Sequence, residues 1–474
     1  MELAISAESP ALMSPLGKRG AKPQRLPPDE RAASYPGGFP RSTSPEFSVE
    51  LQPINGSAIP YVSTWIGFQE STKMRMVAFL LGTVALVAQP VWSGEPIEFK
   101  VQWLTIDANE GCDIGDLDGD GNLDVIAGRN WYRNGDWIAR PVRTIEDERG
   151  YLHTNGDFLY DVNGDGRLDL IAGDYFTTQV YWYENVGGET LLQGYLWPKH
   201  LLVDTGFGSN EASYLHDLNG DGTPEWITNS WVATNPLIVW EMATEDRAVE
   251  RKQGNKTVTE TLTVPTLKRH FINEGGQGHG FGFGDINNDG RVDILTGTGW
   301  HEGPAGDLLT GQWTFHADWN KHLSDPVLVR DLNGDGRNDV IVGNPHDYGL
   351  FVWYAEGMGE DGKLQFREET VDKEFSQLHC IHLADIDGDG QDELITGKRV
   401  RAHNGNDPGG KEPPLMCYYD IDPKTGKFHK HMIEEGHVGI GLQIRTADID
   451  ADGDLDIVVA GKEGTQILYS QLKD

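Results

Sequence analysis

The sequence predicts an all-β protein, a seven-bladed β-propeller with one calcium loop in each blade and an N-terminal strand that closes the last blade. Three observations support this prediction. The 474-residue chain contains 59 glycines and 24 prolines, which favour many tight turns over long helices. It contains seven copies of one acidic loop. The first six copies each belong to a unit with four strand-like segments, the number found in a propeller blade.

The acidic loop is a nine-residue motif, first seen as DLDGDGNLD at residues 116–124. Each copy has Asp or Asn at positions 1, 3 and 5, Gly at position 6 and Asp or Glu at position 9. Alternate side chains on such a loop supply three oxygen ligands to Ca²⁺, and the acid at position 9 completes the coordination sphere. An EF-hand would need flanking helices and a Glu at position 12, whereas these loops continue into strand-like runs such as DVIAG. We therefore predict about seven structural Ca²⁺ ions.

The predicted calcium ligands are the side chains at positions 1, 3, 5 and 9 of the seven loops: Asp116, Asp118, Asp120, Asp124, Asp161, Asn163, Asp165, Asp169, Asp217, Asn219, Asp221, Glu225, Asp285, Asn287, Asp289, Asp293, Asp331, Asn333, Asp335, Asp339, Asp385, Asp387, Asp389, Glu393, Asp448, Asp450, Asp452 and Asp456.

The two ends of the repeat region predict how the fold closes. The seventh unit has only three strand-like segments, and a spare one, residues 98–107, precedes the first loop. Closure would remove exposed sheet edges, which are templates for aggregation. We therefore predict that the N-terminal strand pairs with the last blade.

The first hundred residues differ in composition from the repeats. Residues 1–73 are expected to be a disordered extension or a mis-assigned gene start, and residues 74–93 a cleaved signal peptide. The apolar run at 76–88 is shorter than the ~20 residues of a membrane span, although an uncleaved anchor is the alternative. The propeller is assigned to residues 95–474. We thus expect a secreted, periplasmic or cell-surface protein with no stable membrane span after signal cleavage.

The repeats resemble a known family. The segment FGFGDINNDGRVDILTGTG, residues 281–299, is similar to the FG-GAP/VCBS repeats of integrin heads and many secreted bacterial proteins. The FG and GAP sequences themselves are altered in most units, whereas the predicted metal-ligand positions of the loops are kept. A narrower resemblance, through TGKRVRAHNGNDPGGKEPP at Thr396–Pro414, is to the propeller part of aldos-2-ulose dehydratase. The first resemblance implies calcium-binding blades, and the second would imply dehydratase activity on a sugar.

The face opposite the calcium loops is the predicted functional face. Residues before the first strand of each unit and residues after its second strand should meet there. This face is rich in His, Arg and Trp, which suits a carbohydrate or a uronate-containing glycan, because sugar rings stack on aromatic rings and Arg pairs with carboxylates. The net charge of −35 disfavours nucleic acid. The candidate substrate-binding residues are Trp131, His153, Trp300, His301, His346 and His403.

Two functions fit this face. The first is β-elimination by a carbohydrate lyase or dehydratase, in which a neutral His removes a proton beside a carbonyl group and Arg stabilises the enolate. The alternative is non-catalytic glycan or protein binding of the adhesion type, and the fold alone does not decide between them. Three histidines could instead hold Zn²⁺ or another divalent ion in an axial pocket, although no HExxH spacing indicates one. The candidate catalytic residues are His279, His379, His382, Arg399 and Arg401.

Overall fold

The computed structural model describes residues 96–148, 151–254 and 256–473. The predicted signal peptide and the segment before it lie outside these residues. Within them the regular structure is almost entirely strand, apart from helix α1 (Gly188–Leu192) and the 3-10 turn η1 (Ala402–Gly405). No helix in this part of the chain is long and apolar enough to cross a membrane. The predicted all-β class is confirmed.

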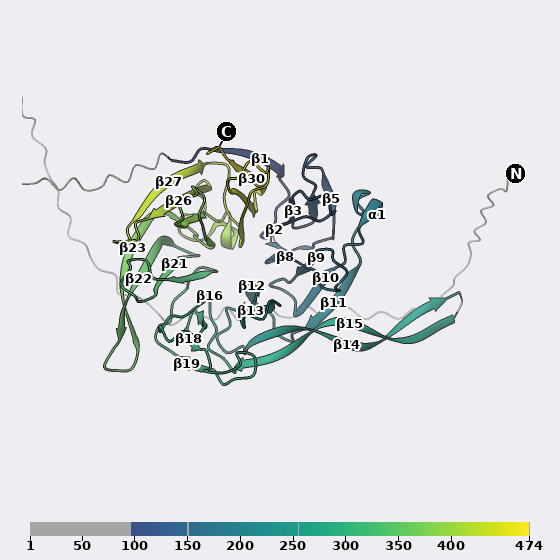
Figure 1. Ribbon diagram of the computed structural model, residues 1–474, viewed down its shortest axis with the longest axis horizontal. Coiled ribbons are helices and arrows are strands. Elements are labelled where there is room, and N and C mark those ends of the chain that lie inside the picture. The colour runs from purple at the N-terminus through teal and green to yellow at the C-terminus, as the bar shows by residue number, and fades with distance from the viewer. Residues whose placement is uncertain (1–95, 149–150, 255, 474) are drawn as a thin grey trace, which may run out of the picture. The chain divides into compact units, whose positions relative to one another are not determined.

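The strands form five four-stranded sheets, one eight-stranded sheet and one two-stranded sheet in the described residues (Figure 1). The eight-stranded sheet consists of two four-stranded antiparallel halves, which are joined because β16 and β20 pair in parallel. We call each group of four antiparallel strands an array and number the arrays along the chain.

The first four arrays contain β2 (Cys112–Gly115), β3 (Asp124–Ala127), β4 (Asn130–Tyr132) and β5 (Ala139–Pro141); β8 (Asp157–Tyr160), β9 (Asp169–Ala172), β10 (Gln179–Tyr183) and β11 (Lys199–Asp204); β12 (Asn210–His216), β13 (Glu225–Ser230), β14 (Leu237–Gln253) and β15 (Lys256–Asn273); and β16 (Phe281–Gly284), β17 (Asp293–Thr296), β18 (Gly299–Glu302) and β19 (Thr314–His316). The remaining arrays contain β20 (Val327–Arg330), β21 (Asp339–Gly343), β22 (Tyr348–Met358) and β23 (Leu364–Ser376); β24 (Ile381–Ala384), β25 (Glu393–Gly397), β26 (Leu415–Ile421) and β27 (Phe428–Glu435); and β28 (Ile444–Ala447), β29 (Asp456–Gly461), β30 (Gly464–Ser470) and β1 (Phe99–Thr105). The two-stranded sheet pairs β6 (Asp147–Glu148) with β7 (Tyr151–Leu152).

The first strand of each array lies on the inside of the molecule. Strand β2 contacts both β8 and β28, and β24 contacts β28. Figure 1 shows β2, β8, β12 and β16 around the centre, with β5, β11, β15 and β19 at the periphery. The segments that lead into the first strands therefore converge near the centre.

Apolar side chains fill the spaces between neighbouring arrays. The second strands, such as β3 and β9, are buried along their whole length because a neighbouring array covers each face. One cluster contains Cys112 and Val125 of the first array together with Val458 and Ile467 of the last. The packing thus continues from the last array back to the first.

The N-terminal strand completes the last array. Strand β1 pairs antiparallel with β30, and Phe99 lies opposite Ser470. The sequence-based prediction that this strand closes the last unit is confirmed. The covered edge of β30 is no longer available for pairing with another chain.

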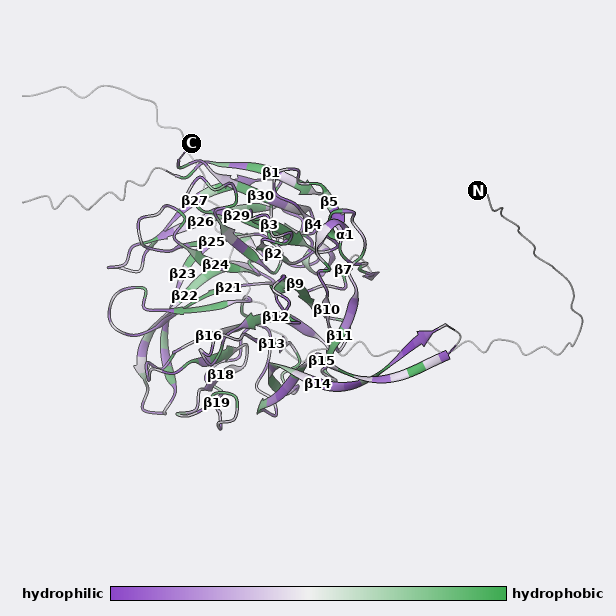
Figure 2. Cartoon of the chain, turned by 45° about the vertical axis from the view of Figure 1, so that its right-hand side comes forward, coloured by the Kyte–Doolittle hydropathy of each residue, from purple (hydrophilic) through white to green (hydrophobic). Residues whose placement is uncertain are grey.

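One feature of the third array was not predicted. Strands β14 and β15 are 17 and 18 residues long and pair along their length as an antiparallel ribbon. Figure 2 shows that the part of the ribbon that projects beyond the other strands is mainly hydrophilic. It lies away from the convergent inner segments.

Candidate functional site

The seven acidic loops share one hydrogen-bonding pattern. In every loop the N–H of the Gly at position 6 donates to the carboxylate at position 1, over 2.8 to 3.1 Å. The N–H at position 2 donates to the acid at position 9, over 2.9 to 3.2 Å. The position-6 glycines have positive φ, 90° at Gly121 for example, which side-chained residues adopt only with strain. Each loop is thus a preformed turn between the first and second strands.

The loops fit a hard cation. In the first loop Asp116, Asp118 and Asp124 each offer a carboxylate oxygen within 4.8 Å of the others, and the sixth and seventh loops offer equivalent sets. Burial raises the pKa of Asp124 to about 7, as expected for a carboxylate removed from water without a countercharge. Arg133 also contacts the first loop, with its Nε atom 2.5 Å from Asp118. Oxygen donors at this spacing are the ligand type that Ca²⁺ prefers.

At the other end of each first strand, one repeat position supplies a side chain to the centre of the molecule. This position lies six residues before the first Asp of each loop, and we call its seven residues the inner ring: Glu110, Asn155, Glu211, His279, Asp325, His379 and Leu442. Neighbouring entry segments are hydrogen-bonded to one another. The Asp325 N–H donates to the His379 carbonyl over 2.9 Å, and the Leu442 N–H donates to the Glu110 carbonyl over 2.7 Å.

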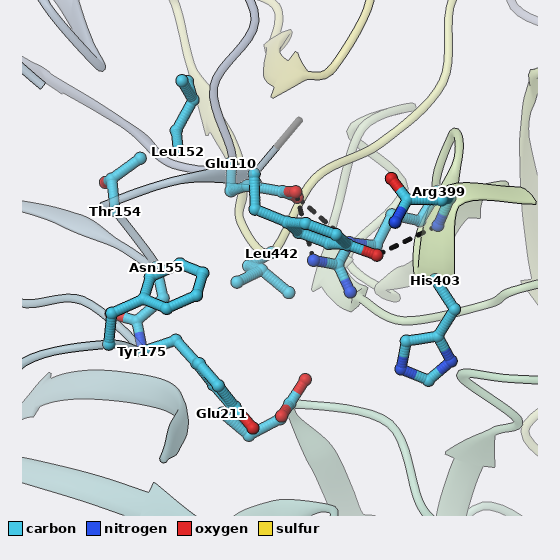
Figure 3. Close-up of a pocket in the computed structure, with 12 residues that line it drawn as sticks. Glu110, Leu152, Thr154, Asn155, Tyr175, Glu211, Arg399, His403 and Leu442 are labelled. Carbon is cyan, nitrogen blue, oxygen red and sulfur yellow. Dashed lines mark hydrogen bonds and ion pairs between the residues drawn. The ribbon is translucent and has the colours of Figure 1, made fainter. Parts of the chain in front are cut away.

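A pocket of about 420 Å³ opens at the inner ring. Figure 3 shows Glu110, Asn155, Glu211 and Leu442 at this pocket. The aromatic rings of Tyr151, Tyr175 and Phe176 and the side chains of Arg399 and His403 complete much of its lining. Arg399 and His403 come from the segment between β25 and β26, which carried the narrower sequence resemblance.

A buried ion cluster forms one side of the pocket. Arg399 makes a bidentate contact with Glu110, with its Nε and Nη2 atoms 3.0 and 3.1 Å from the two carboxylate oxygens. Lys462 also contacts Glu110. Burial acts to raise the pKa of Glu110, but the two cations hold it at about 2. Glu110 is therefore ionised, and two cations share one anion at this wall.

A cluster of histidines forms the adjoining part of the inner ring. The Nε2 atoms of His279 and His379 each lie 3.5 Å from Glu211 Oε1. The Nε2 atoms of His346 and His279 are 2.9 Å apart. Asp407 contacts both His346, at 3.2 Å, and His403, at 3.0 Å. His279 and His379 are buried, and Glu211, His346 and Asp407 are partly buried, whereas the His403 side chain is 58% exposed.

The structure brings together five of the predicted site residues: His279, His346, His379, His403 and Arg399. His322, which precedes β20, is exposed and stacks on His279 with ring centroids 5.6 Å apart. These residues come from the segments before first strands and after second strands, as the sequence predicted.

Three predicted substrate-binding residues belong to the core instead. Trp131 and His301 are 0% exposed and Trp300 is 1% exposed, so none can contact a substrate. Trp300 donates its indole N–H to Asp318 over 2.9 Å, and His301 bonds the Gly276 carbonyl at 2.9 Å. Burial lowers the pKa of His301 to about 4. The substrate-binding prediction is wrong for these three residues.

Three other predicted residues lie apart from the cluster. His382 Nε2 lies 3.1 Å from the Thr446 hydroxyl on β28. Arg401 is exposed and does not line the pocket, although its neighbour Arg399 does. His153 stacks on Phe176 at 4.4 Å and lines an adjacent cavity.

Sequence reasoning missed Glu110, Glu211, Asp325 and Asp407. The first three occupy the same repeat position as His279 and His379, so counting six residues back from every loop would have found them. Asp407 lies in an irregular segment outside the repeat pattern, and no sequence signal identified it.

The chain matches known proteins over parts of its length. A family model described as FG-GAP-like repeat matches residues 161–228 and 331–396. Integrin alpha-PS5 of Drosophila melanogaster is 23% identical over 243 residues, which cover 46% of this chain and 23% of the integrin. Integrin alpha-PS3 of the same organism is 27% identical over 165 residues, covering 32% and 14%. This chain therefore spans less than a quarter of the length of either integrin.

Among solved structures, the V. cholerae biofilm matrix protein Bap1 is similar with 14% identity and a TM-score of 0.30, covering 74% of this chain and 45% of that one. The resemblance to aldos-2-ulose dehydratase stays a prediction. The repeat matches and the integrin relatives agree with the array arrangement and with the predicted resemblance. The chain contains FG-GAP-like repeats, and these matches support a relationship to the FG-GAP-repeat propeller family.

Proposed function

We propose that this chain is an exported seven-bladed β-propeller that binds a carbohydrate in the inner-ring pocket. Each array would be one blade. The apolar clusters between neighbouring arrays, including the cluster that joins the last array to the first, support this number. Export accords with the predicted signal peptide.

The acidic loops would hold calcium, with the side chains at positions 1, 3, 5 and 9 as ligands. The carboxylate oxygens gathered in the first, sixth and seventh loops support this assignment. A bound ion would connect the two strands of the inner hairpin and balance the buried acid at position 9. Its role would be structural.

The pocket lining is the observation that carries the binding proposal. Tyr151, Tyr175 and Phe176 offer aromatic faces, while Asn155, Glu211 and Arg399 offer hydrogen-bonding groups in the same cavity. Sugars present both apolar C–H faces and hydroxyl groups, so this combination suits them. A volume of about 420 Å³ lies within the usual range for small-molecule pockets, roughly 300 to 1,000 Å³.

Binding fits the geometry better than elimination by the predicted bases. A general base must reach the proton that it removes. His379 is 0% exposed and His279 is 6% exposed, so both lie beneath the pocket surface. A uronate-containing glycan stays a candidate ligand, because the Arg399 guanidinium lines the pocket and guanidinium groups pair with carboxylates.

The proposal is tested by calorimetric titration of the full chain, in saturating Ca²⁺, with neutral and uronate-containing oligosaccharides. We expect binding that Tyr151→Ala and Tyr175→Ala each weaken by about tenfold or more, equivalent to ~1.4 kcal/mol. Tyr195→Ala is the matched control, because Tyr195 is 62% exposed and does not line the pocket.

Each other outcome overturns the proposal. Absence of binding to any oligosaccharide, or equal loss in the Tyr195→Ala control, would remove the carbohydrate role. New ultraviolet absorbance from an unsaturated product would instead establish elimination. Binding of a protein that the Tyr151→Ala variant also loses, without any glycan binding, would make the pocket a protein-recognition site.

A further inference from the structure

We propose that His279, His346, His379 and Glu211 form a second kind of metal centre, which binds one divalent transition-metal ion such as Zn²⁺ and is independent of the calcium loops. Each of the three histidines offers a ring nitrogen, and these three atoms lie within 4.8 Å of one another. Glu211 Oε1 adds an oxygen 3.5 Å from two of the rings.

The hydrogen bonds of two histidines orient their lone pairs inward. His279 Nδ1 lies 2.9 Å from the Leu323 carbonyl, and His346 Nδ1 lies 3.2 Å from the Asp407 carboxylate. Both partners are acceptors at neutral pH, so each Nδ1 carries the proton and donates it. The Nε2 atom of each neutral ring is then an unprotonated lone pair. These two atoms face each other at 2.9 Å, and a cation between them would relieve their repulsion.

The third histidine, His379, has only the 3.5 Å contact between its Nε2 atom and Glu211. Neither ring nitrogen of His379 makes a hydrogen bond to a described residue, although the side chain is completely buried. Buried polar groups are nearly always paired, so a ring in this state indicates a ligand. Ligands about 2.0–2.1 Å from one ion lie up to about 4 Å apart, which requires only small side-chain movements here.

An extra proton is the competing explanation. Burial opposes a charge on His279, but the contact with Glu211 raises the pKa of His279 overall. A protonated His279 could donate Nε2–H to His346. That proton would still leave both ring nitrogens of His379 without a hydrogen bond, and burial lowers the pKa of His346 to about 3 and that of His379 well below its usual range. A metal ion would engage all three rings at once.

The surroundings determine the class of metal. Imidazole nitrogen suits Zn²⁺, Co²⁺ and related ions, whereas Ca²⁺ requires oxygen ligands. Asp407 accepts a hydrogen bond from His346 Nδ1, the ring nitrogen that would not bind the metal, in the carboxylate–histidine arrangement common at metal centres. Glu211 also lines the pocket, with a side chain that is 15% exposed. The ion would therefore adjoin the pocket and could contact a hydroxyl or carboxylate of a bound ligand.

The test is a titration of the metal-stripped full chain with Co²⁺ in saturating Ca²⁺, which occupies the oxygen sites. We expect one Co²⁺ per chain, with the intense visible absorption of nitrogen-ligated cobalt and its displacement by one equivalent of Zn²⁺. His346→Ala and His379→Ala should lose this spectrum. Asp407→Asn should retain the spectrum but bind about 10- to 100-fold more weakly, because Asp407 positions a ligand rather than binding the metal.

His437→Ala is the matched control, because the His437 side chain is 77% exposed and its ion pair is with Glu434, which is not one of the proposed ligands. Circular dichroism and calcium-dependent melting identify variants that fail to fold, and His346→Gln is the conservative replacement in that case. The proposal is overturned if the wild-type chain in Ca²⁺ binds no Co²⁺, as the shared-proton explanation requires. It is also overturned if the folded His346 or His379 variants give the wild-type spectrum.

Discussion

The two ends of the first strands of the arrays differ in how strictly their residues repeat from unit to unit. At one end, the seven acidic loops repeat nearly the same residues, and the same two hydrogen bonds from a backbone N–H to a side-chain carboxylate recur in every copy. At the other end, the equivalent inner-ring position holds two glutamates, an asparagine, two histidines, an aspartate and a leucine. Residues that every unit needs for its own hairpin are repeated. Residues that form a single site in the centre of the molecule need not be repeated in every unit.

The cost of burial strengthens this distinction. Glu110, Asp325, His279 and His379 are almost completely buried. Buried ionisable groups are expensive, and well-packed apolar residues at such positions are often at least as stable. Leu442 shows that the fold accepts an apolar residue at this position. The ionisable members of the inner ring are therefore better explained by function than by stability.

We expect the largest effect on folding from removal of β1, the strand that completes the last array. Deletion of residues 1–107 removes β1 and exposes the edge of β30, so we expect aggregation or failure to fold. Deletion of residues 1–93 keeps β1 and is the matched control. Size-exclusion chromatography and melting curves check this, and equal behaviour of the two proteins would contradict a structural role for β1.

Calcium removal should have the next largest effect, because it acts on every loop together. Ions that bind only the folded state stabilise it by ~2.7 kcal/mol per site at a concentration of 100 Kd. Chelation followed by back-titration with Ca²⁺ alone should lower and then restore Tm. A Tm that is unchanged by chelation would show that the seven acidic loops do not need bound ions for stability. The carboxylates of these loops would then require another explanation.

The sequence was most informative where the repeat pattern was regular. The loops could be predicted because their residues have the same spacing in each copy. The closing strand could be predicted because the last unit lacks a fourth segment and residues 98–107 supply one. The position of Trp131 could not be predicted, because a large aromatic residue after a second strand suits both a core and a pocket, and burial depends on the side of the strand it faces. The inner-ring acids were missed because residue type, rather than register from the loops, guided the search.

The next prediction concerns the buried ion cluster of Glu110, Arg399 and Lys462 and how its contribution to the free energy of unfolding changes in acid. Glu110→Gln leaves Arg399 and Lys462 without their anion, and breaking such a pair costs ~3–5 kcal/mol. The pKa of Glu110 is lowered from 4.5 to about 2, so its contribution is present above pH 4.5 and is lost as the pH falls toward 2. Urea unfolding from pH 5 downward should show that the difference between wild type and Glu110→Gln narrows with acid. A constant difference would mean that Glu110 acts through packing rather than charge.

A single loop substitution should have the smallest effect, and one that depends on calcium. Asp335, at position 5 of the fifth loop, accepts the Arg337 N–H over 2.9 Å and pairs with the Arg337 guanidinium at 2.7 Å. In Ca²⁺, Asp335→Ala should cost up to ~2.7 kcal/mol, because one of several ions is lost. In a chelator the same change removes an exposed ion pair, worth ~0–1 kcal/mol, and one exposed hydrogen bond from the Arg337 N–H. Asp361→Ala is the matched control, since Asp361 also accepts a backbone N–H two residues ahead but lies outside the acidic loops. Urea unfolding in both conditions measures the four differences, and an equal cost of Asp335→Ala with and without Ca²⁺ would exclude this carboxylate as a calcium ligand.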